Sequence, residues 1–496
     1  MDIIYRPYVD PDFELLLERI HPPRVCIDND ACPDCTLVKV DSANKHGILL
    51  EMVQNLTDLD LVISKSYICS DGGWFMDVFH VTDQLGSKIT DPSLILYIQQ
   101  ALCASRREGL KDPTPHPGRA VRPKHVSTDH TALEMSGADR PGLMSEISAA
   151  LAEMGCHVFA AVAWTHKTRV ASIVYVEDEA TGGPITDAKR LAQIEQQLGC
   201  IVGTHGGQNG ERSSVGLTAP APSRTHTERR LHQLMFADGD FERCGSCDCG
   251  GAASRSGGEA EGYGWKSGGG GDGYRKKKCL GTHVCIESCK EKGYSVVNVR
   301  SRDRPKLLFD TVCTLTDLQY VVFHAAVSSK GSIADQEYFV RRKDGCTLVT
   351  ESERKRVTQC LIAAIERRVS HGMRLDVCTR NRLGLLSDVT RLFRENGLSI
   401  SRAEIGMRGE KAIGSFYVTD ASGNDMVKPE TIELVRKEIG GTVAVVNEPT
   451  GWPSSSSTTG RSASSSKLED PPRFSLGSLL WAQLERLSIN FGPIKS

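Results

Sequence analysis

The chain has 496 residues, with 60 Lys and Arg against 62 Asp and Glu, and 39% of its residues are hydrophobic. This length exceeds one ordinary domain, and the hydrophobic fraction is sufficient for several cores. The net charge of -2 provides no positive field for a phosphate backbone, and no stretch reaches the roughly 20 apolar residues that cross a bilayer. We therefore expect neither nucleic acid nor a membrane as a primary partner.

The amino-terminal residues and the cysteines indicate a reducing compartment. Residues 1–13 combine several charges with no continuous apolar run, so no secretory signal or transit peptide is expected. The 17 cysteines are an odd number and are scattered through apolar patterns, which is typical of buried thiols and not of a disulfide framework. We expect an intracellular protein, first in the cytoplasm; the basic run 275–278 keeps the nucleus as an alternative.

One pattern of strand, tight turn, helix, strand, hairpin and strand recurs four times. The copies start at Asn44, Asp139, Asp303 and Asn381. Positions eight and twelve after each start continue a helical stripe, and position nineteen carries a β-branched residue. An alternating strand pattern follows at positions 35 and 37, as in Phe79/Val81, Val174/Val176, Tyr338/Val340 and Phe416/Val418. We therefore predict four α+β units of the same kind.

A second helix follows in each unit, and the odd and even copies then differ. The even copies continue into candidate fourth strands at 200–202 and 442–446, which completes the ferredoxin-like order βαββαβ. The odd copies instead carry the triplet Val-Cys-Ile ahead of their first strand, at 25–27 and 284–286. We infer that the odd copies are circularly permuted.

Composition places the boundaries between these units. Residues 206–282 are rich in glycine and predict a flexible linker, so we expect the blocks 24–205 and 283–449 to fold independently. Within this linker, residues 227–236 form an amphipathic helix that we expect to dock on the protein's own core. The predicted segments are an N-terminal arm at 1–23, repeats at 24–112, 125–205, 283–370 and 371–449, linkers at 113–124 and 206–282, and a serine-rich disordered tail at 450–496 with a short amphipathic segment.

The turn between the first strand and the first helix is the candidate binding site. Its pattern Asp/Asn-x-x-Gly-Leu leaves the amides of the first helical turn for an anion such as an α-carboxylate. The leading Asp or Asn either caps the helix or faces a ligand's ammonium group. The alternative to a binding site is that the whole turn is an ordinary structural helix cap. The candidate ligand-binding residues are Asn44, Gly47, Asp139, Gly142, Leu143, Asn381, Gly384 and Leu385.

The third copy departs from this pattern because Lys306 replaces the glycine. We expect this lysine to be solvated and the third site to be silent. The alternative is that the lysine attracts a more acidic ligand.

Motifs for catalysis are absent from the sequence: it contains no His-Glu-x-x-His, no Gly-x-Ser-x-Gly and no Walker loop. We expect no enzyme, no cofactor and no bound metal. The best metal candidate is Cys244-x2-Cys247-x-Cys249 with Cys279, and Cys32-x2-Cys35 is weaker. Redox sensing by the linker thiols is an alternative.

The repeats resemble ACT domains, the small regulatory modules of amino-acid metabolism. Four of them without a catalytic domain resemble the plant ACT-domain-repeat family, and residues 225–235 and 302–312 resemble that family's sequences closely. The resemblance implies four tandem ferredoxin-like domains in two side-by-side pairs, a free amino acid as ligand, and regulation instead of turnover. It also implies self-association or a protein partner at the sheet edges. The alternative is an interaction scaffold whose units pair but bind no ligand.

Overall fold

The structure is a computed structural model that describes residues 24–43, 47–71, 74–104, 130–203, 213–218, 226–243, 281–289, 293–369, 371–420, 422–423, 427–439 and 441–446. The predictions for the arm at 1–23, the linker at 113–124, the linker cysteines and the tail at 450–496 lie outside these residues. Among the helices within them, none combines the length and the apolar character that a bilayer crossing requires.

All four predicted units form, in the predicted order of elements. The first copy contains β1 (Arg24–Asp28), β2 (Thr36–Ala43), α2 (Ile48–Asp58), β3 (Val62–Asp71), β4 (Trp74–Thr82) and α3 (Pro92–Ala104). The second contains β5 (Thr131–Ala138), α4 (Leu143–Glu153), β6 (Cys156–His166), β7 (Arg169–Asp178), α5 (Ala188–Gly203) and β8 (Ser214–Thr218). The third contains β9 (His283–Cys289), β10 (Tyr294–Arg302), α7 (Leu307–Asp317), β11 (Tyr320–Lys330), β12 (Ile333–Arg342) and α8 (Glu351–Arg367). The fourth contains β13 (Met373–Arg380), α9 (Leu385–Glu395), β14 (Leu398–Arg408), β15 (Lys411–Asp420), α10 (Pro429–Ile439) and β16 (Thr442–Val446).

The circular permutation of the odd copies is confirmed. Strand β1 pairs antiparallel with β2, and β9 with β10, at the place where β8 pairs with β5 and β16 with β13 in the even copies. The predicted strand at 200–202 is wrong, because these residues belong to α5. Ile194, Leu198 and Val202 continue one buried helical stripe, and this burial keeps the segment helical. The fourth strand of the second copy is β8, further along the chain.

Deletion of residues 1–30, which removes β1, should lower the free energy of unfolding by about 2–4 kcal/mol. Val25 and Ile27 pack against the core, and five residue pairs join β1 to β2. Urea denaturation of the truncated and full chains measures this loss. An unchanged midpoint would show that β1 is a dispensable arm.

The copies pair in an order that the sequence did not predict. One eight-stranded sheet has the order β1-β2-β4-β3-β11-β12-β10-β9, and the other has the order β16-β13-β15-β14-β6-β7-β5-β8. Copies 1 and 3, here the odd pair, meet at β3 and β11, while copies 2 and 4, the even pair, meet at β6 and β14. The expectation that 24–205 and 283–449 fold independently is wrong, because each sheet takes strands from both blocks. All four copies offer an equivalent edge strand, so their repeated pattern does not specify which two edges meet.

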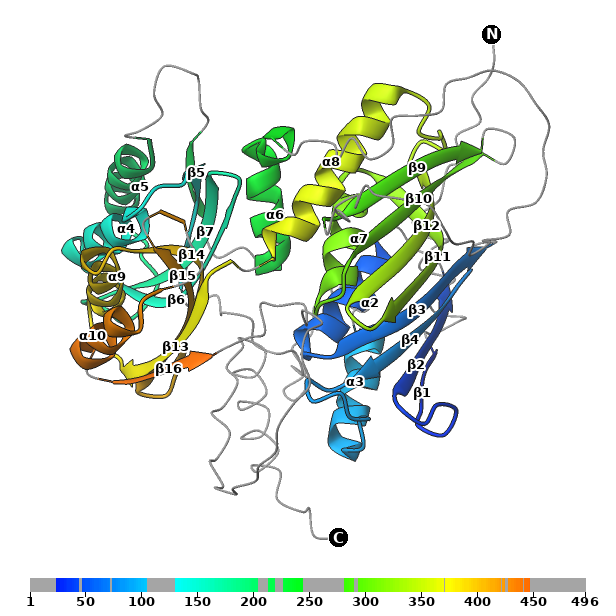
Figure 1. The fold of residues 1–496 in the computed structure, drawn as a ribbon, viewed down its shortest axis with the longest axis horizontal. Helices are drawn as coiled ribbons and strands as arrows, with labels where there is room; N and C mark the ends of the chain where they lie inside the picture. Colours follow the sequence, from blue (N-terminus) through cyan, green and yellow to red (C-terminus); the bar gives the residue numbers. More distant parts are fainter. Residues whose placement is uncertain are drawn as a thin grey trace, which may run out of the picture.

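Part of the predicted flexible linker is regular structure. Helix α6 (Thr227–Ala237) and a short 3-10 helix (Asp240–Arg243) follow β8. Figure 1 shows α6 between the two sheets: α4, α5, α9 and α10 cover the far face of the even sheet, and its other face is turned toward α6. Leu231, Leu234 and Met235 of α6 pack there in one cluster with residues of β6 and β7, among them Trp164. The predicted docking of residues 227–236 on the protein's own core is therefore confirmed.

Candidate ligand site between the second and fourth copies

The turn before the first helix has one backbone geometry in every copy. The residue that precedes the helix is left-handed, with φ of 83° at Gly47, 84° at Gly142, 66° at Lys306 and 71° at Gly384. No side chain caps these four helices. The first helical amide donates to the carbonyl of the turn arginine in three copies, as from Leu385 to Arg382 at 3.2 Å, so the next two amides are the ones that remain for water or a ligand.

The predicted capping role of Asp139 and Asn381 is wrong. The left-handed glycine, three residues further on, occupies the cap position. The backbone N–H of Asp139 donates instead to the Thr168 carbonyl at 2.8 Å, and that of Asn381 donates to the Glu410 carbonyl at 2.8 Å. Each turn is thus fixed to the hairpin of its own copy.

An ion pair inside the turn repeats in three copies and was missed in the sequence. It joins the arginine one position after the start to the acidic residue seven positions after it, as in Arg304 Nη2 to Asp310 Oδ2 at 2.7 Å and Arg382 Nη2 to Asp388 Oδ2 at 2.5 Å. In the second copy Arg140 pairs with Glu146. An arginine and an acidic residue recur six positions apart at the same place in these three copies, and this repetition could have predicted the ion pair.

The even pair brings the predicted site residues of two copies to one interface. Helices α4 and α9 pack together, and the buried hydroxyls of Ser148 and Thr390 lie 2.8 Å apart. Both residues stand nine positions after the start of their copy, so the two copies are related by an approximate twofold axis at this contact. Each turn therefore faces the first helix of the other copy.

The turn of the fourth copy opens into a cavity of about 40 Å³. Asn381, Gly384 and Leu385 line it, together with Ala152 and His157 from the second copy. His157 Nε2 lies 3.2 Å from Asn381 Oδ1, and this contact holds the amide of Asn381 across the interface. The cavity thus joins an uncapped helix start to two polar side chains from different copies.

The turn of the second copy is similar, but its cavity is only about 10 Å³. Asp139, Gly142 and Leu143 line it, opposite Arg394 of the fourth copy. Arg394 stands thirteen positions after the start of its copy, where the second copy has Ala152. A Cβ at Gly142 would lie 2.8 Å from Arg394 Cδ, whereas a Cβ at Gly384 would lie 3.9 Å from Ala152 Cβ. The arginine therefore fills one cavity, and the alanine leaves the other open.

The carboxyl group of Asp139 is a titratable group in the smaller cavity. Burial raises its pKa to about 6, against the opposing hydrogen bond from the Arg140 amide. This carboxyl therefore gains its charge closer to neutral pH than an exposed aspartate does.

In the odd pair, the start of α6 lies beside the turn of the third copy, where the even pair has its cavities. Lys306 Nζ donates to Glu228 Oε1 at 2.8 Å, and His226 Nε2 lies 2.6 Å from Asp58 Oδ1 at the end of α2. The expectation that Lys306 is solvated is wrong, because its side chain is only 27% exposed. Burial by itself would raise the pKa of Glu228, but Arg368 and Lys306 hold it well below its usual value. The carboxylate of Glu228 thus faces the third turn.

In the first copy, Gly47 adopts the shared turn geometry, and Asn44 lies outside the described residues.

A buried ionic group, here the central cluster, fixes α6 to the odd pair. It consists of Arg304, Asp310, Arg368 and His232. Asp310 is fully buried, and its carboxylate lies 2.7 Å from Arg368 Nη2, 2.7 Å from Arg304 Nη2 and 2.8 Å from His232 Nε2 of α6. The guanidinium of Arg368 also lies 4.8 Å from the ring centre of Trp164 on the even sheet. The central cluster therefore connects both pairs through α6.

Paired βαββαβ units that share one sheet, with glycine turns facing each other's helices, define a protein built from tandem ACT-type domains. A family model described as the ACR family N-terminal ACT domain matches residues 31–109, and the ACT domain model matches 373–440. The chain is 53% identical to the ACT domain-containing protein ACR1 of Arabidopsis thaliana, over 98% of both chains. It is 50% identical to ACR3 of the same plant, over 88% of this chain and 90% of that one. The chain therefore belongs to the ACR family of ACT domain-containing proteins. Its ACT domains and these relatives support a regulatory role in amino-acid sensing.

Proposed function

We propose that this protein is a non-catalytic regulator that binds a small free amino acid at the turn of the fourth copy. The observation that carries the proposal is the open cavity between Gly384 and Ala152. The uncapped start of α9 suits the α-carboxylate of the ligand, because amides and the helix dipole favour an anion there. The side-chain oxygen of Asn381 suits the ammonium group.

The size of the cavity restricts the ligand. A volume of about 40 Å³ accommodates roughly three water-sized groups. This favours amino acids with the smallest side chains over aromatic or long ones. The other turns are less suited, since Arg394 narrows the second and Glu228 pairs with the lysine of the third.

A thermal-shift screen of the full chain against the common amino acids tests the proposal. A ligand that binds only the folded state stabilises it by about 2.7 kcal/mol at a concentration of 100 times its Kd. We expect at least one small amino acid to raise the melting temperature. No shift with any of them at millimolar concentration would favour the alternative, an interaction scaffold that binds no ligand.

Partners and compartment are part of the same proposal. Strands β1, β9, β8 and β16 end the two sheets, and such edges suit self-association or a protein partner. The cysteines that the structure describes are all free thiols. This supports a reducing compartment such as the cytoplasm.

Replacement of Ala152 by arginine should weaken amino-acid binding at least tenfold, about 1.4 kcal/mol. The new side chain repeats the arrangement by which Arg394 fills the smaller cavity. Calorimetric titration with the amino acid found in the screen measures the loss. Ala192→Arg is the matched control, because it makes the same substitution at an exposed position of α5 and should leave the affinity unchanged. Equal affinities of Ala152→Arg and the unmodified chain would contradict the assignment of the site.

A further inference from the structure

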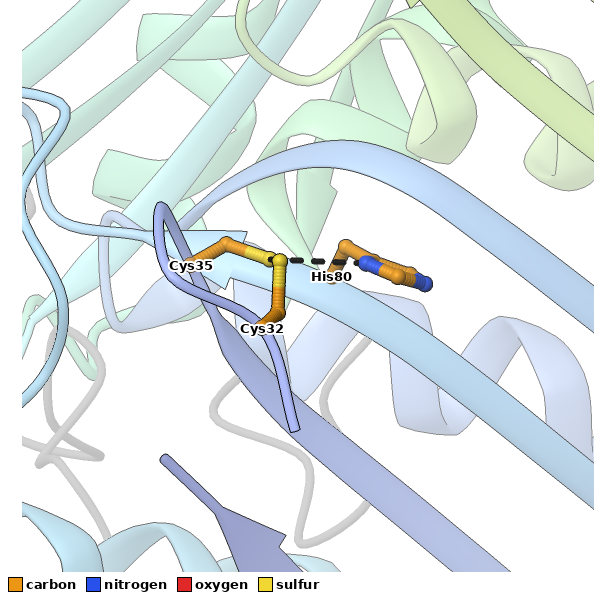
Figure 2. A group of neighbouring side chains, drawn as sticks. All are labelled: Cys32, Cys35 and His80. Atoms are coloured by element: carbon orange, nitrogen blue, oxygen red, sulfur yellow. Dashed lines mark hydrogen bonds between the residues drawn. The ribbon is translucent and has the colours of Figure 1, made fainter. Parts of the chain in front are cut away.

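A cluster outside the ligand site joins two thiols and an imidazole on the odd sheet. Cys32 and Cys35 lie in the loop between β1 and β2, and His80 lies on β4 (Figure 2). The two Sγ atoms are 3.1 Å apart, and Cys35 Sγ is 3.4 Å from His80 Nδ1. All three ligand atoms lie within 4.8 Å of one another. We propose that Cys32, Cys35 and His80 bind a divalent metal ion of the zinc type.

The spacing fits a tetrahedral ion. Zinc bonds of about 2.3 Å to sulfur and 2.0–2.1 Å to nitrogen place tetrahedral ligand atoms roughly 3.4–3.8 Å apart. The Cys35–His80 separation of 3.4 Å is close to the value for a thiolate and an imidazole on one zinc ion, whereas the two sulfur atoms, at 3.1 Å, must move apart by about 0.7 Å, which side-chain rotations can supply. The sulfur atoms are much further apart than the roughly 2.05 Å of a disulfide, so both cysteines are thiols here.

The kinds of ligand select the metal. Two thiolates and one imidazole favour Zn²⁺ over Mg²⁺ or Ca²⁺, which prefer oxygen ligands. In the sequence, Cys32-x2-Cys35 has no further metal ligand nearby. The fold brings His80 of β4 to the two cysteines as the third ligand. Three protein ligands leave a fourth position for water or another ligand.

The backbone around the cluster holds the ligands in place. His80 is fixed in the sheet because Leu37 on β2 and Lys65 on β3 stand opposite it in the ladders. In the loop, the Asp28 carboxylate accepts the amides of Asp30 and Ala31 at 3.0 Å each. The site would therefore bind metal with little rearrangement and join the permuted strand β1 to the centre of its copy.

Protons compete with the metal at this site. The thiol of Cys35 donates to Cys32 at 3.1 Å. Zinc binds thiolates and neutral imidazole, so metal binding must displace this proton and should weaken as the pH falls.

The test is Zn²⁺ titration of the reduced, metal-free full chain against a chromophoric chelator. All samples carry the substitutions Cys244→Ser, Cys247→Ser, Cys249→Ser and Cys279→Ser, which remove the linker thiols as competing ligands. Cys32→Ser and His80→Gln are the test variants, and Cys69→Ser removes an exposed cysteine of β3 as the control. Co²⁺ in place of Zn²⁺ adds a second readout, because its thiolate charge-transfer absorption counts bound sulfurs. Circular dichroism of the metal-free variants verifies that they are folded.

We expect one equivalent of Zn²⁺ in the background chain and in Cys69→Ser, with affinity at least about tenfold lower in Cys32→Ser and His80→Gln. The Co²⁺ charge-transfer absorption should fall in Cys32→Ser, whereas His80→Gln should retain both sulfur contributions at saturating Co²⁺. Three results would overturn the proposal. The first is no Zn²⁺ binding by the reduced background chain, the second is equal affinity in the two test variants and the background, and the third is a Cys32–Cys35 disulfide that persists under reductant.

Discussion

Replacement of Asp310 by alanine should lower the free energy of unfolding by about 3–5 kcal/mol. Asp310 is fully buried, and its carboxylate balances the buried guanidinium groups of Arg304 and Arg368 at 2.7 Å each. Without it, both positive charges stay buried without their principal partner. Urea denaturation of the full chain measures the loss. The contact of His232 with this carboxylate also disappears, so α6 should lose protection from hydrogen exchange.

The matched control is Asp335→Ala, which breaks an exposed pair with Arg300. The two side chains of that pair are 51% and 61% exposed, so the loss should stay below about 1 kcal/mol. Similar losses in the two variants would contradict the importance assigned to the central cluster.

The same carboxylate gives the protein an acid-sensitive contribution to stability. Burial alone would raise the pKa of Asp310, but Arg368 and Arg304 hold it well below the usual 3.8. A depressed pKa stabilises the folded state above the unfolded value and loses this contribution as the pH falls. The difference in stability between the unmodified chain and Asp310→Ala should therefore shrink below about pH 4.

Cleavage of the chain between residues 244 and 280 should leave the molecule in one piece. A protease site inserted there separates copies 1 and 2 from copies 3 and 4. The two fragments share both sheets, through β3 with β11 and through β6 with β14, and each sheet has one continuous core. We expect the fragments to elute together in size-exclusion chromatography and to unfold in the same transitions as the intact chain.

Two separately eluting, cooperatively folded monomers would contradict this pairing and would restore the expectation of two independent blocks. As the control, the same protease site in the tail at 450–496 should release only a short peptide.

The units of the fold were predictable because their signals are local. The helical stripe and the alternating strands return at the same positions in every copy, and the triplet at 25–27 revealed the permutation. The pairing of copies was not predictable, since all four present equivalent edge strands. The apolar residues of α6 predicted its docking, but the ion pairs that also attach it, such as Glu228 with Lys306, were not predictable, because their partners lie in copies far away in the sequence.

Only the turn residues of the candidate ligand site were predictable from the sequence. The turn residues Asn381, Gly384 and Leu385 line the larger cavity, and the repeat at fixed register pointed to them. What distinguishes the two cavities lies in the facing copy, where Ala152 and Arg394 occupy equivalent positions. Because the sequence does not reveal that the second and fourth copies pair, it gives no reason to compare these two residues.

Hydrogen–deuterium exchange of the full chain, with and without the amino acid found in the thermal screen, locates the ligand site directly. We expect the ligand to slow exchange in the first turn of α9, residues 385–388, and in the facing residues 156–158. We expect no change at the third turn, residues 303–308, where α6 already lies. Protection at the third turn without protection at α9 would contradict the assignment of the ligand site to the interface of the second and fourth copies.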